Sequence, residues 1–320
     1  MRTAARDRLR RYLADFLVGV GVLILAGCGL RSPSSSIRLS DFEPAGPDQS
    51  VSSVPRGQLR LAVAPVYSPR RTFQVYRDLA AHLGRASGLT AEVIQGKTYA
   101  EINDLVRSGT VTLAVVCTNA YIEGQEAFGM EAVAVPVVQQ RTVYYSYLIV
   151  PRESPARRLE DLRGVTFAFS DPLSNSGRLA AVYQLLLRGE TPESFFRRHI
   201  FTYSHDNSIH AVVRKVVDGA AVDSLVYDYA AAADPDIIAK TRVIERWGPY
   251  GINPIAVHPR LNPAVKRTLQ RTLLGMHRTA EGRDILARLG IERFVEPDDR
   301  IYNSVRAMRA RVKQDLRDRP

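Results

Sequence analysis

The sequence predicts an α/β fold with two lobes, each a mixed, mostly parallel sheet flanked by helices, joined by strands that cross between the lobes. Three observations support this prediction. From residue 58 onward, short apolar segments alternate with amphipathic ones, which is typical of parallel strands with crossover helices. Two longer β segments interrupt the alternation before it resumes. A late β segment then indicates that the chain returns to the first lobe.

The first run of segments predicts three strands, two helices and a pair of longer β segments. Apolar, β-branched stretches predict the strands, and apolar residues at helical spacing predict the helices. The longer segment TVYYSYLIV is the one expected to cross to the second lobe. The predicted strands are 58–66, 90–95 and 111–116, the helices are 72–87 and 98–108, and the longer β segments are 130–138 and 142–150.

The second lobe is predicted to begin near residue 151, with a short helix that Gly164 ends. Predicted strands 165–169, 199–203, 219–222 and 241–246 alternate with predicted helices 177–187, 207–217 and 224–233. Residues 248–261 predict the return strand, and residues 263–274, 279–289 and 298–315 predict helices. We therefore assign residues 56–145 and 250–320 to lobe 1, and residues 146–249 to lobe 2.

The N-terminal segment predicts a targeting signal. A basic stretch precedes the apolar run 16–26, which is too short for a membrane-spanning helix of about 20 residues. LAGC ends this run at Cys28 and resembles a bacterial lipobox. Residues 1–27 are therefore predicted to be a lipoprotein signal peptide, with an uncleaved anchor as the alternative. Cys28 would be lipidated, and Gly29 weakly favours the outer membrane. Residues 28–55, rich in Ser, Pro and Gly, predict a flexible tether.

Composition argues against several functional classes. The chain has a formal net charge of +11, yet its Lys and Arg residues occur in isolated pairs such as Arg70-Arg71 and not in a long run, so no nucleic-acid module is expected. If Cys28 carries lipid, Cys117 remains as a lone thiol, and no disulfide is expected. Whether Cys117 is a buried small hydrophobe or a reactive thiol stays open at this point.

Enzyme chemistry is not expected. Ser204, His205 and Asp206 are adjacent in the sequence and cannot take the nucleophile, base and orienting positions of a triad. No metal-ligand spacing, Walker loop or nucleophile elbow is present in the sequence. We expect no cofactor, no metal and a monomeric binding module.

The segment FSDPLSNSGR carries the main functional signal. Ser174, Asn175, Ser176 and Gly177 lie where a strand turns into a helix, so their hydroxyl and N–H donors can converge on an anion. The alternative is an ordinary helix cap. Tyrosines also follow strand ends at Tyr67, Tyr99 and Tyr121, and Tyr121 is preferred as the one that reaches the ligand.

Three further side chains are candidates for the same site. His205 could be a neutral acceptor or a charged donor. Asp206 and Asp223 would repel a fully ionised oxyanion but could accept a hydrogen bond from a protonated oxygen. Each aspartate could instead be a turn or cap residue: Asp206, with Asn207, would serve well as a cap of the helix that follows, and Asp223 could be a turn residue.

Four segments together resemble a known family: FAFSDPLSNSG, FTYSHDNSIHAVV, VDGAAVDSLVYDY and PYGINPIAV. They are similar to the substrate-binding proteins of phosphate, phosphite and phosphonate ABC transporters, from about residue 59 to residue 305. The resemblance implies a two-lobed periplasmic-binding-protein fold (type II-like) that closes on a tetrahedral oxyanion. The ligand residues it implies are Tyr121, Ser174, Asn175, Ser176, Gly177, His205 and Asp223. Asn175 departs from the hydroxyl residue that many relatives have at its position.

The implied function is a lipid-anchored periplasmic protein that captures phosphonate, phosphite or phosphate for an ABC permease. An alternative is a sensor that presents its closed form to a membrane histidine kinase. Cys117 supports the alternative because it is expected near the cleft, where a thiolate would suit a soft ligand such as arsenite, and similar proteins of this family sense arsenite.

Overall fold

The computed structural model describes residues 57–67 and 69–318, all within one compact unit. The predicted signal peptide, Cys28 and the tether lie outside these residues. Among the described helices, none combines the length and apolarity needed to cross a membrane.

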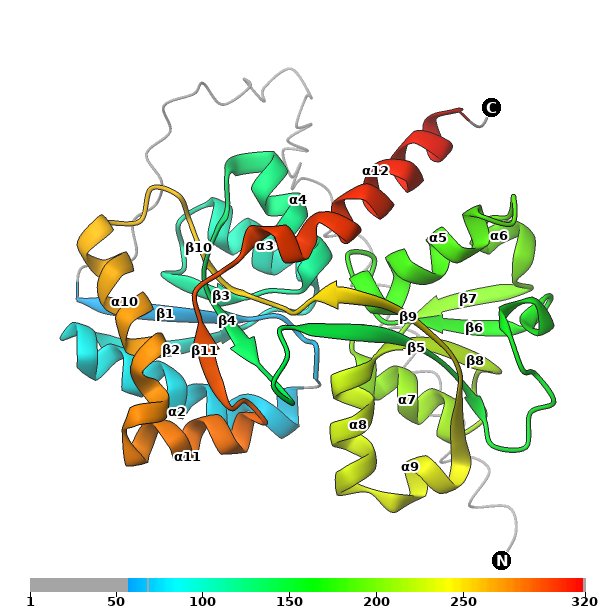
Figure 1. The fold of residues 1–320 in the computed structure, drawn as a ribbon, viewed down its shortest axis with the longest axis horizontal. Coiled ribbons are helices and arrows are strands. Elements are labelled where there is room, and N and C mark those ends of the chain that lie inside the picture. The colour runs from blue at the N-terminus through cyan, green and yellow to red at the C-terminus, as the bar shows by residue number, and fades with distance from the viewer. Residues whose placement is uncertain (1–56, 68, 319–320) are drawn as a thin grey trace, which may run out of the picture. The chain divides into compact units, whose positions relative to one another are not determined.

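The first sheet has strand order β11-β4-β10-β3-β1-β2 (Figure 1). Its strands are β1 (Gln58–Val63), β2 (Thr90–Gln95), β3 (Leu113–Val115), β4 (Glu131–Val137), β10 (Ile255–Val257) and β11 (Arg293–Val295). β1 is parallel to β2 and β3, whereas the β10 and β11 pairings are antiparallel. Alternate residues of β1 enter different cores, since Leu61 packs in one cluster and Ala62 in another, as the two-residue period of a strand requires.

Helices cover both faces of this sheet. They are α2 (Pro69–Ser87), α3 (Tyr99–Arg107), α4 (Thr118–Phe128), α10 (Pro263–Gly275) and α11 (Ala280–Leu289), and η4 (Met276–Arg278) links the last two. α2, α10 and α11 supply Leu79, Leu273 and Ile285 to one core, and α3 and α4 supply Ile102 and Ile122 to the other.

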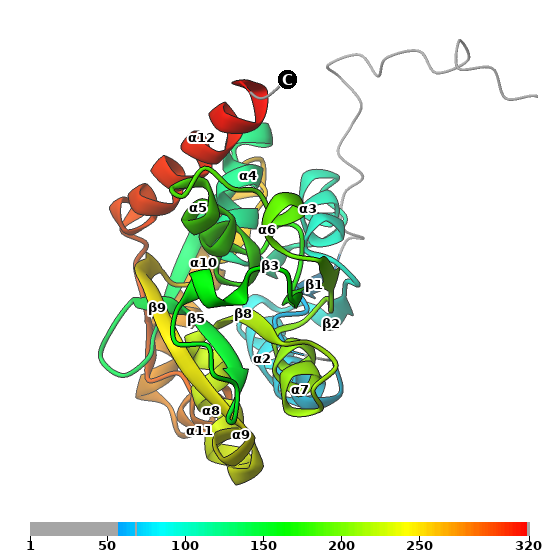
Figure 2. The ribbon, with the colours of Figure 1, turned by 90° about the vertical axis from the view of Figure 1, so that its right-hand side faces the viewer.

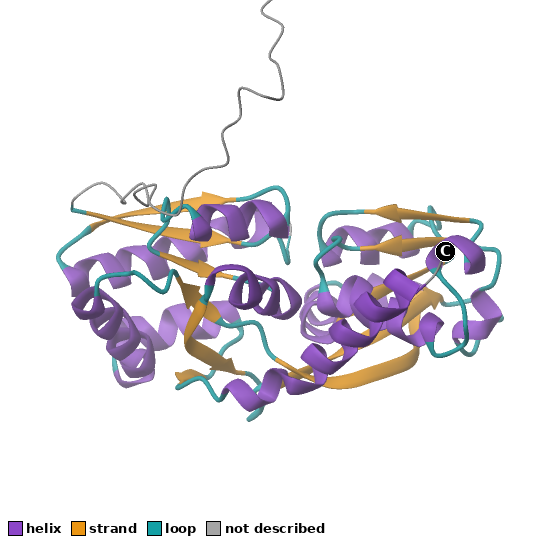
Figure 3. Ribbon diagram, turned by 90° about the horizontal axis from the view of Figure 1, so that it is seen from above, coloured by secondary structure: helices purple, strands orange, loops and turns teal. Residues whose placement is uncertain are grey.

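The second sheet has strand order β7-β6-β8-β5-β9. Its strands are β5 (Val143–Pro151), β6 (Thr166–Phe169), β7 (Arg198–Phe201), β8 (Gly219–Asp223) and β9 (Thr241–Gly251). β6 is parallel to β7 and β8, and β5 is antiparallel to β8 and β9. Figure 3 shows the strands of the two sheets as separate groups, with β5 and β9 running toward the first.

Helices also cover both faces of the second sheet. In Figure 2, α5 (Ala180–Leu186) and α12 (Asn303–Asp318) lie above it, and α7 (His205–Val213), α8 (Ser224–Ala233) and α9 (Pro235–Lys240) lie below it. The remaining short helices are η2 (Leu159–Leu162), η3 (Asn175–Leu179), α6 (Pro192–Phe195) and η5 (Asp299–Tyr302). Isoleucine and valine side chains of α7 and α8 pack with Ile149 of β5, whereas Leu148 faces the opposite core.

The chain passes twice between the sheets. The first passage runs from β4 to β5 and the second from β9 to β10. α12 packs against both parts, because Val305 shares a core with Phe167 of β6, while Arg309 forms ion pairs with Glu123 and Glu126 of α4. The C-terminal helix therefore contacts elements that flank both sheets.

The structure confirms the two-sheet α/β fold and differs from the prediction in detail. Parallel pairing within the described sheets is confined to the neighbours of β1 and β6, because the returning strands pair antiparallel. No helix was predicted between the strand 111–116 and the β segment 130–138, but the structure has α4 there, which ends before Gly129 with φ 79°. Gly124 inside α4 interrupts its apolar spacing, and a Cβ there would lie 2.5 Å from Met130 Cε, so close packing explains the glycine.

Candidate functional site

The serine segment turns from β6 into a helix as predicted, but the helix begins two residues earlier, as a π turn. Ser174 is the N-cap of this turn, η3, and its Oγ accepts the N–H of Gly177 at 2.9 Å. α5 continues directly from Ala180. Ser174 therefore has the role of a helix cap, which was the alternative considered for this segment. Single π turns are frequent at functional sites. Ser174, Asn175 and Ser176 are completely buried.

Gly177 is required by the close approach of two other residues. A Cβ at this position would lie 1.7 Å from Ser170 Oγ and 2.9 Å from Cε1 of His205. Real Cβ atoms do not approach other heavy atoms this closely, so no larger residue fits without movement. The glycine therefore lets a serine and a histidine meet at the start of the helix.

His205 links the serine turn to β8. The backbone N–H of Asp223 donates to His205 Nδ1 at 3.0 Å. Burial lowers the pKa of His205 to about 3, so the ring is neutral at pH 7 and its proton lies on Nε2. Nε2 is 3.4 Å from Ser174 Oγ and donates to it. Since Ser174 Oγ then accepts two hydrogen bonds, its own proton is available to a ligand.

Asp223 is buried at the end of β8 and caps α8. Its Oδ1 accepts the N–H groups of Leu225 at 2.8 Å and Val226 at 3.4 Å. Burial raises the pKa of Asp223 to about 7 against the opposing effect of these two N–H groups. The carboxyl group is therefore partly protonated at neutral pH and can accept or donate a hydrogen bond.

The alternative role of Asp206 and Asn207, as caps of α7, is not the one that the structure shows. The N-cap is Ser204, whose Oγ accepts the N–H of Asn207 at 3.3 Å. Asp206 is buried in the first turn of α7, where a negative charge interacts favourably with the helix dipole.

Hydrogen bonds connect elements of the two sheets around this turn. The N–H of His205 donates to Val66 O at 3.1 Å, and the N–H of Tyr99 donates to Asp171 Oδ2 at 3.1 Å. Asn119 Nδ2 donates to Leu173 O at 3.1 Å. These bonds join segments that follow β1, β2 and β3 to segments that follow β6 and β7. The serine turn is therefore enclosed between the sheets.

Four buried polar atoms near this turn have no hydrogen-bond partner among the described residues: Tyr99 Oη, Ser170 Oγ, Asn175 Oδ1 and Ser176 Oγ. Buried polar groups without partners are rare in folded proteins and costly. Three of these atoms are hydroxyls that can donate to an anion. The fourth can accept from a protonated ligand oxygen. This group is the donor and acceptor set that a tetrahedral oxyanion needs.

Tyr99 lies beside the serine segment, whereas Tyr121 packs elsewhere. The backbone N–H of Tyr99 donates to Asp171, three residues before Ser174, and burial raises the pKa of Tyr99 well above its usual value. The Tyr121 ring packs against Tyr302 at 5.0 Å, and its hydroxyl accepts from Gln125. The structure does not bring Tyr121 to the other predicted ligand residues.

Asn175 uses part of its donor capacity within the protein. Its side-chain amide donates one hydrogen bond to Tyr144 Oη at 2.9 Å, and its backbone N–H lies 3.5 Å from Cys117 Sγ. Its amide oxygen has no partner among the described residues, and the amide carries a second N–H besides the one that Tyr144 accepts. A hydrogen bond from Asn175 to the ligand therefore stays a prediction.

Cys117 lies beside the serine turn and is buried, with 2% of the residue exposed. Burial raises the pKa of Cys117 to about 12, so the group is a thiol and not a thiolate at neutral pH. Cys117 is therefore a buried thiol and not a reactive thiolate. Its sulfur also contacts the backbone N–H of Asn175, so it forms part of the surface around the serine turn.

The described residues contain no cluster of His, Cys, Asp and Glu that could hold a metal ion. Arg178 is the basic residue of the turn, and its Nη1 donates to Pro172 O at 3.3 Å. The buried groups of the turn that can donate to an anion are hydroxyls and N–H groups. Ser170 and Tyr144 were not singled out from the sequence, whereas Tyr99 was considered and ranked behind Tyr121. The available signal for Ser170 is that it directly follows a predicted strand.

Residues 61–302 match the model of a family described as the periplasmic substrate-binding protein of phosphonate ABC transporters. The phosphonates-binding periplasmic protein of Escherichia coli K12 is 28% identical over 160 residues, which are 49% of this chain and 47% of that protein. The chain thus matches about half the length of this curated relative.

Solved structures share the fold. A binding protein component of a phosphonate ABC transporter from Pseudomonas aeruginosa superposes with a TM-score of 0.75 at 22% identity, covering 80% of this chain and 86% of that one. PhnD1 from Prochlorococcus marinus, in complex with methylphosphonate, superposes with a TM-score of 0.71 at 16% identity, covering 80% and 98%. Because the family model covers most of the described residues, this chain belongs to the family of periplasmic substrate-binding proteins of phosphonate ABC transporters.

Proposed function

We propose that this protein captures a phosphorus oxyanion between its two sheets and delivers it to an ABC permease. The observation that carries the proposal is the group of unpartnered buried atoms on Tyr99, Ser170, Asn175 and Ser176. A tetrahedral oxyanion would give these hydroxyls acceptors and, when protonated, give Asn175 a donor. A phosphonate is the favoured ligand because the family and the curated relative are described by it, and phosphite and phosphate are the related candidates.

The charge of the site suits a ligand that must be released. Hydroxyl and N–H donors stabilise an oxyanion without a buried cation, as helix N-termini commonly do. Asp223, with a pKa raised by burial to about 7, would repel a fully ionised ligand but share a proton with a singly protonated one. The site therefore selects between protonation states as well as between shapes.

Further parts of the proposal concern partners and location. We propose that residues 56–145 with 250–320 and residues 146–249 act as the two lobes, and that Cys28 anchors a monomer to the membrane by lipid, with the outer membrane favoured. The family consists of binding proteins, so the chain is not an enzyme.

Titration calorimetry tests the ligand. The protein should bind methylphosphonate. The variant Ser176→Ala should bind it roughly tenfold or more weakly, as expected for a lost hydrogen bond to a charged group. Ser87→Ala is the matched control, because Ser87 Oγ is also buried and unpartnered but lies at the end of α2. Equal affinities of both variants, or no heat with methylphosphonate, phosphite and phosphate, would refute the proposal.

The second candidate function is a sensor of arsenite for a histidine kinase. One observation favours it: Cys117 Sγ is 3.5 Å from the N–H of Asn175, at the wall of the same site. Binding would require the thiol proton to leave, since burial raises its pKa to about 12. Arsenite titration of wild type and Cys117→Ser decides this point. An unchanged affinity in the variant would exclude a role for the thiol.

A further inference from the structure

Asn119 of α4 lies between the C-terminal helix α12 and the serine segment. Its Oδ1 accepts a hydrogen bond from Nη1 of Arg309 at 3.0 Å, and its Nδ2 donates to the backbone carbonyl of Leu173 at 3.1 Å. Leu173 directly precedes Ser174, the cap of the serine turn. Asn119 and Arg309 are 3% and 8% exposed. One buried amide therefore connects α12 to the residue before the turn.

Arg309 determines which way this amide points. A guanidinium group only donates hydrogen bonds, so Oδ1 of Asn119 faces Arg309 and Nδ2 faces Leu173. The guanidinium is itself held by α4, because Nη2 donates to Glu123 Oε2 at 2.8 Å and Nε donates to Glu126 Oε2 at 3.4 Å. The planar fork of an arginine serves these partners at once and keeps a fixed orientation.

Both backbone polar groups of Leu173 have partners. Its N–H donates to Asp171 Oδ1 at 2.8 Å, and Asp171 Oδ2 accepts the N–H of Tyr99, at the start of α3. The carbonyl of Leu173 takes its hydrogen bond from Asn119. If the Asn119 amide turned over, this carbonyl would face an oxygen, which is unfavourable. The residue before the serine turn is thus held by α3 and α4, the helices beside the first sheet.

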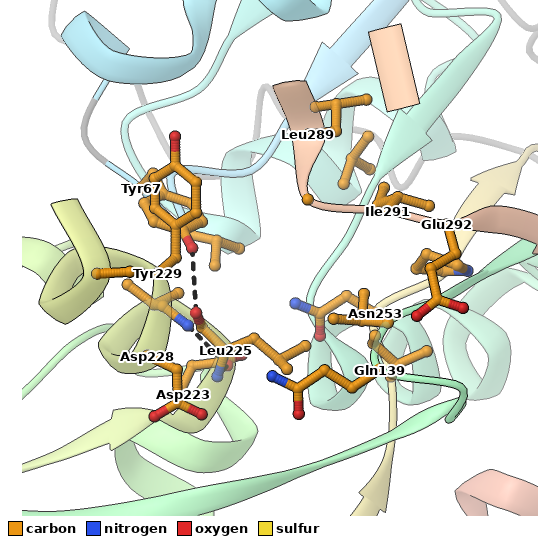
Figure 4. Close-up of a pocket in the computed structure, with 18 of the residues that line it drawn as sticks. Tyr67, Gln139, Asp223, Leu225, Asp228, Tyr229, Asn253, Leu289, Ile291 and Glu292 are labelled. Carbon is orange, nitrogen blue, oxygen red and sulfur yellow. Dashed lines mark hydrogen bonds between the residues drawn. The ribbon is translucent and has the colours of Figure 1, made fainter. Parts of the chain in front are cut away.

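Neither Asn119 nor Arg309 belongs to the residues assigned to the ligand. The unpartnered buried atoms of the site come from other residues. Asp223 also lines a cavity of about 430 Å³, which Figure 4 shows, and neither Asn119 nor Arg309 is among its described lining residues. Any influence of the two residues on binding would therefore pass through Leu173 to the turn.

We propose that Asn119, oriented by Arg309, is a positioning residue that holds the serine turn in its ligand-binding place. The bond from Asn119 to Leu173 joins a helix beside the first sheet to a segment that follows a strand of the second, so it is lost when the two move apart. The bond raises ligand affinity, because a ligand binds more weakly when fewer molecules are in the competent state. The effect on affinity rests on the proposed function, whereas the effect on the order of the turn does not.

Calorimetry with methylphosphonate tests the effect on affinity. Asn119→Asp keeps an acceptor for Arg309 but replaces the donor to Leu173 with a second oxygen, and it should weaken binding roughly five- to tenfold. Asn119→Leu, which has a similar shape and no charge, should weaken binding in the same direction.

A double-mutant cycle tests whether Arg309 acts through Asn119. Arg309→Met should weaken binding when Asn119 is present and should cause no further loss in the Asn119→Leu variant. Losses of affinity that simply add would show that Arg309 does not act through the amide.

The neighbouring pair of Gln125 and Arg306 provides a matched control. Nη2 of Arg306 in α12 donates to Gln125 Oε1 at 2.5 Å, so α12 orients this amide of α4 as well. Nε2 of Gln125 donates to Tyr121 Oη at 3.3 Å and not to the serine segment. Gln125→Glu therefore makes the same chemical change as Asn119→Asp and should leave methylphosphonate affinity unchanged.

Hydrogen exchange without ligand, measured by mass spectrometry, tests the order of the turn directly. The N–H of Gly177 donates to Ser174 Oγ, and Asn119→Asp should speed its exchange because Ser174 is held less firmly. Exchange in β1 should stay as in wild type, which shows that the variant is folded. Gln125→Glu should not change exchange in the turn.

The two measurements separate the positioning role from the proposed function. If wild type binds methylphosphonate, and Asn119→Asp matches Gln125→Glu in both affinity and exchange, the positioning role is refuted and the oxyanion function stands. If wild type binds no phosphonate, phosphite or phosphate, and Asn119→Asp still speeds exchange in the turn, the oxyanion function is refuted and the positioning role stands.

Discussion

Replacing Asp223 by Asn should stabilise the protein increasingly as pH rises. Burial raises the pKa of Asp223 to about 7, against an ordinary value of 3.8. Between these values the unfolded chain loses the proton and the folded chain keeps it, so ionisation favours unfolding. Stability is thus lost as pH rises from 3.8 to 7 and is constant above 7. Asn has no such proton, and its amide oxygen can still cap α8 through the N–H groups of Leu225 and Val226.

The size of the effect follows from the pKa difference. The difference between a pKa of about 7 and the ordinary value of 3.8 corresponds to about 4 kcal/mol at pH 8, and well under half of this is already present at pH 5. The stability difference between Asp223→Asn and wild type should therefore grow by about 3 kcal/mol between these pH values. His205, whose pKa burial lowers to about 3, destabilises both proteins equally at low pH and cancels in the comparison.

Urea unfolding of both proteins at pH 5 and pH 8, without ligand, measures this difference. Thr279→Ala, at the exposed N-cap of α11, serves as a variant whose effect should not change with pH, because the Thr279 hydroxyl bonds the backbone groups of Gly282 and Met276. A pH-independent difference between Asp223→Asn and wild type would show that Asp223 is not held in a raised-pKa environment, and the proton-sharing argument for the ligand would fail with it.

Three other predictions follow from single contacts. Gly177→Ala should destabilise the fold by about 1–3 kcal/mol, because its Cβ would collide with Ser170, and a thermal melt close to wild type would contradict the packing argument. Tyr99→Phe should lower methylphosphonate affinity roughly tenfold, whereas Tyr121→Phe should leave it unchanged, and the reverse result in calorimetry would restore the prediction from the sequence. Arg309→Met should destabilise the protein by about 2 kcal/mol, because its ion pairs with Glu123 and Glu126 are lost and Glu126 keeps only Lys313 as an ion-pair partner among the described residues; urea unfolding measures this, and no loss would show that the ion pairs contribute little.

The accuracy of the sequence prediction differs from element to element for physical reasons. β1 and α3 were predicted within a few residues because their apolar residues repeat at the period of a strand and a helix. α4 was missed because Gly124 interrupts its spacing and is explained only by the side chain of Met130, from the segment that follows. The antiparallel pairing of β5 with β8 and β9 depends on the direction in which the chain returns, which no local pattern encodes.

The candidate site shows the same division. The serine turn follows from local features, since a strand, a run of small polar residues and an apolar helix are adjacent in the sequence. The choice of tyrosine does not, because Tyr99 and Tyr121 both follow predicted strands, and only packing directs Tyr121 to Tyr302. The pKa values of His205 and Asp223 likewise depend on burial, which was not predictable for polar side chains at the ends of elements.

The sequence by itself determined that the chain is a two-lobed α/β protein with a donor-rich turn after a strand of the second sheet. Hydrophobic period and small polar residues are local properties, and they suffice for both conclusions. The tertiary structure decided which distant groups surround the turn: Cys117 lies against Asn175, Tyr99 beside Asp171, and His205 beside Asp223. These contacts join residues from separate elements, so they are determined by how the two sheets close on each other and not by any single segment.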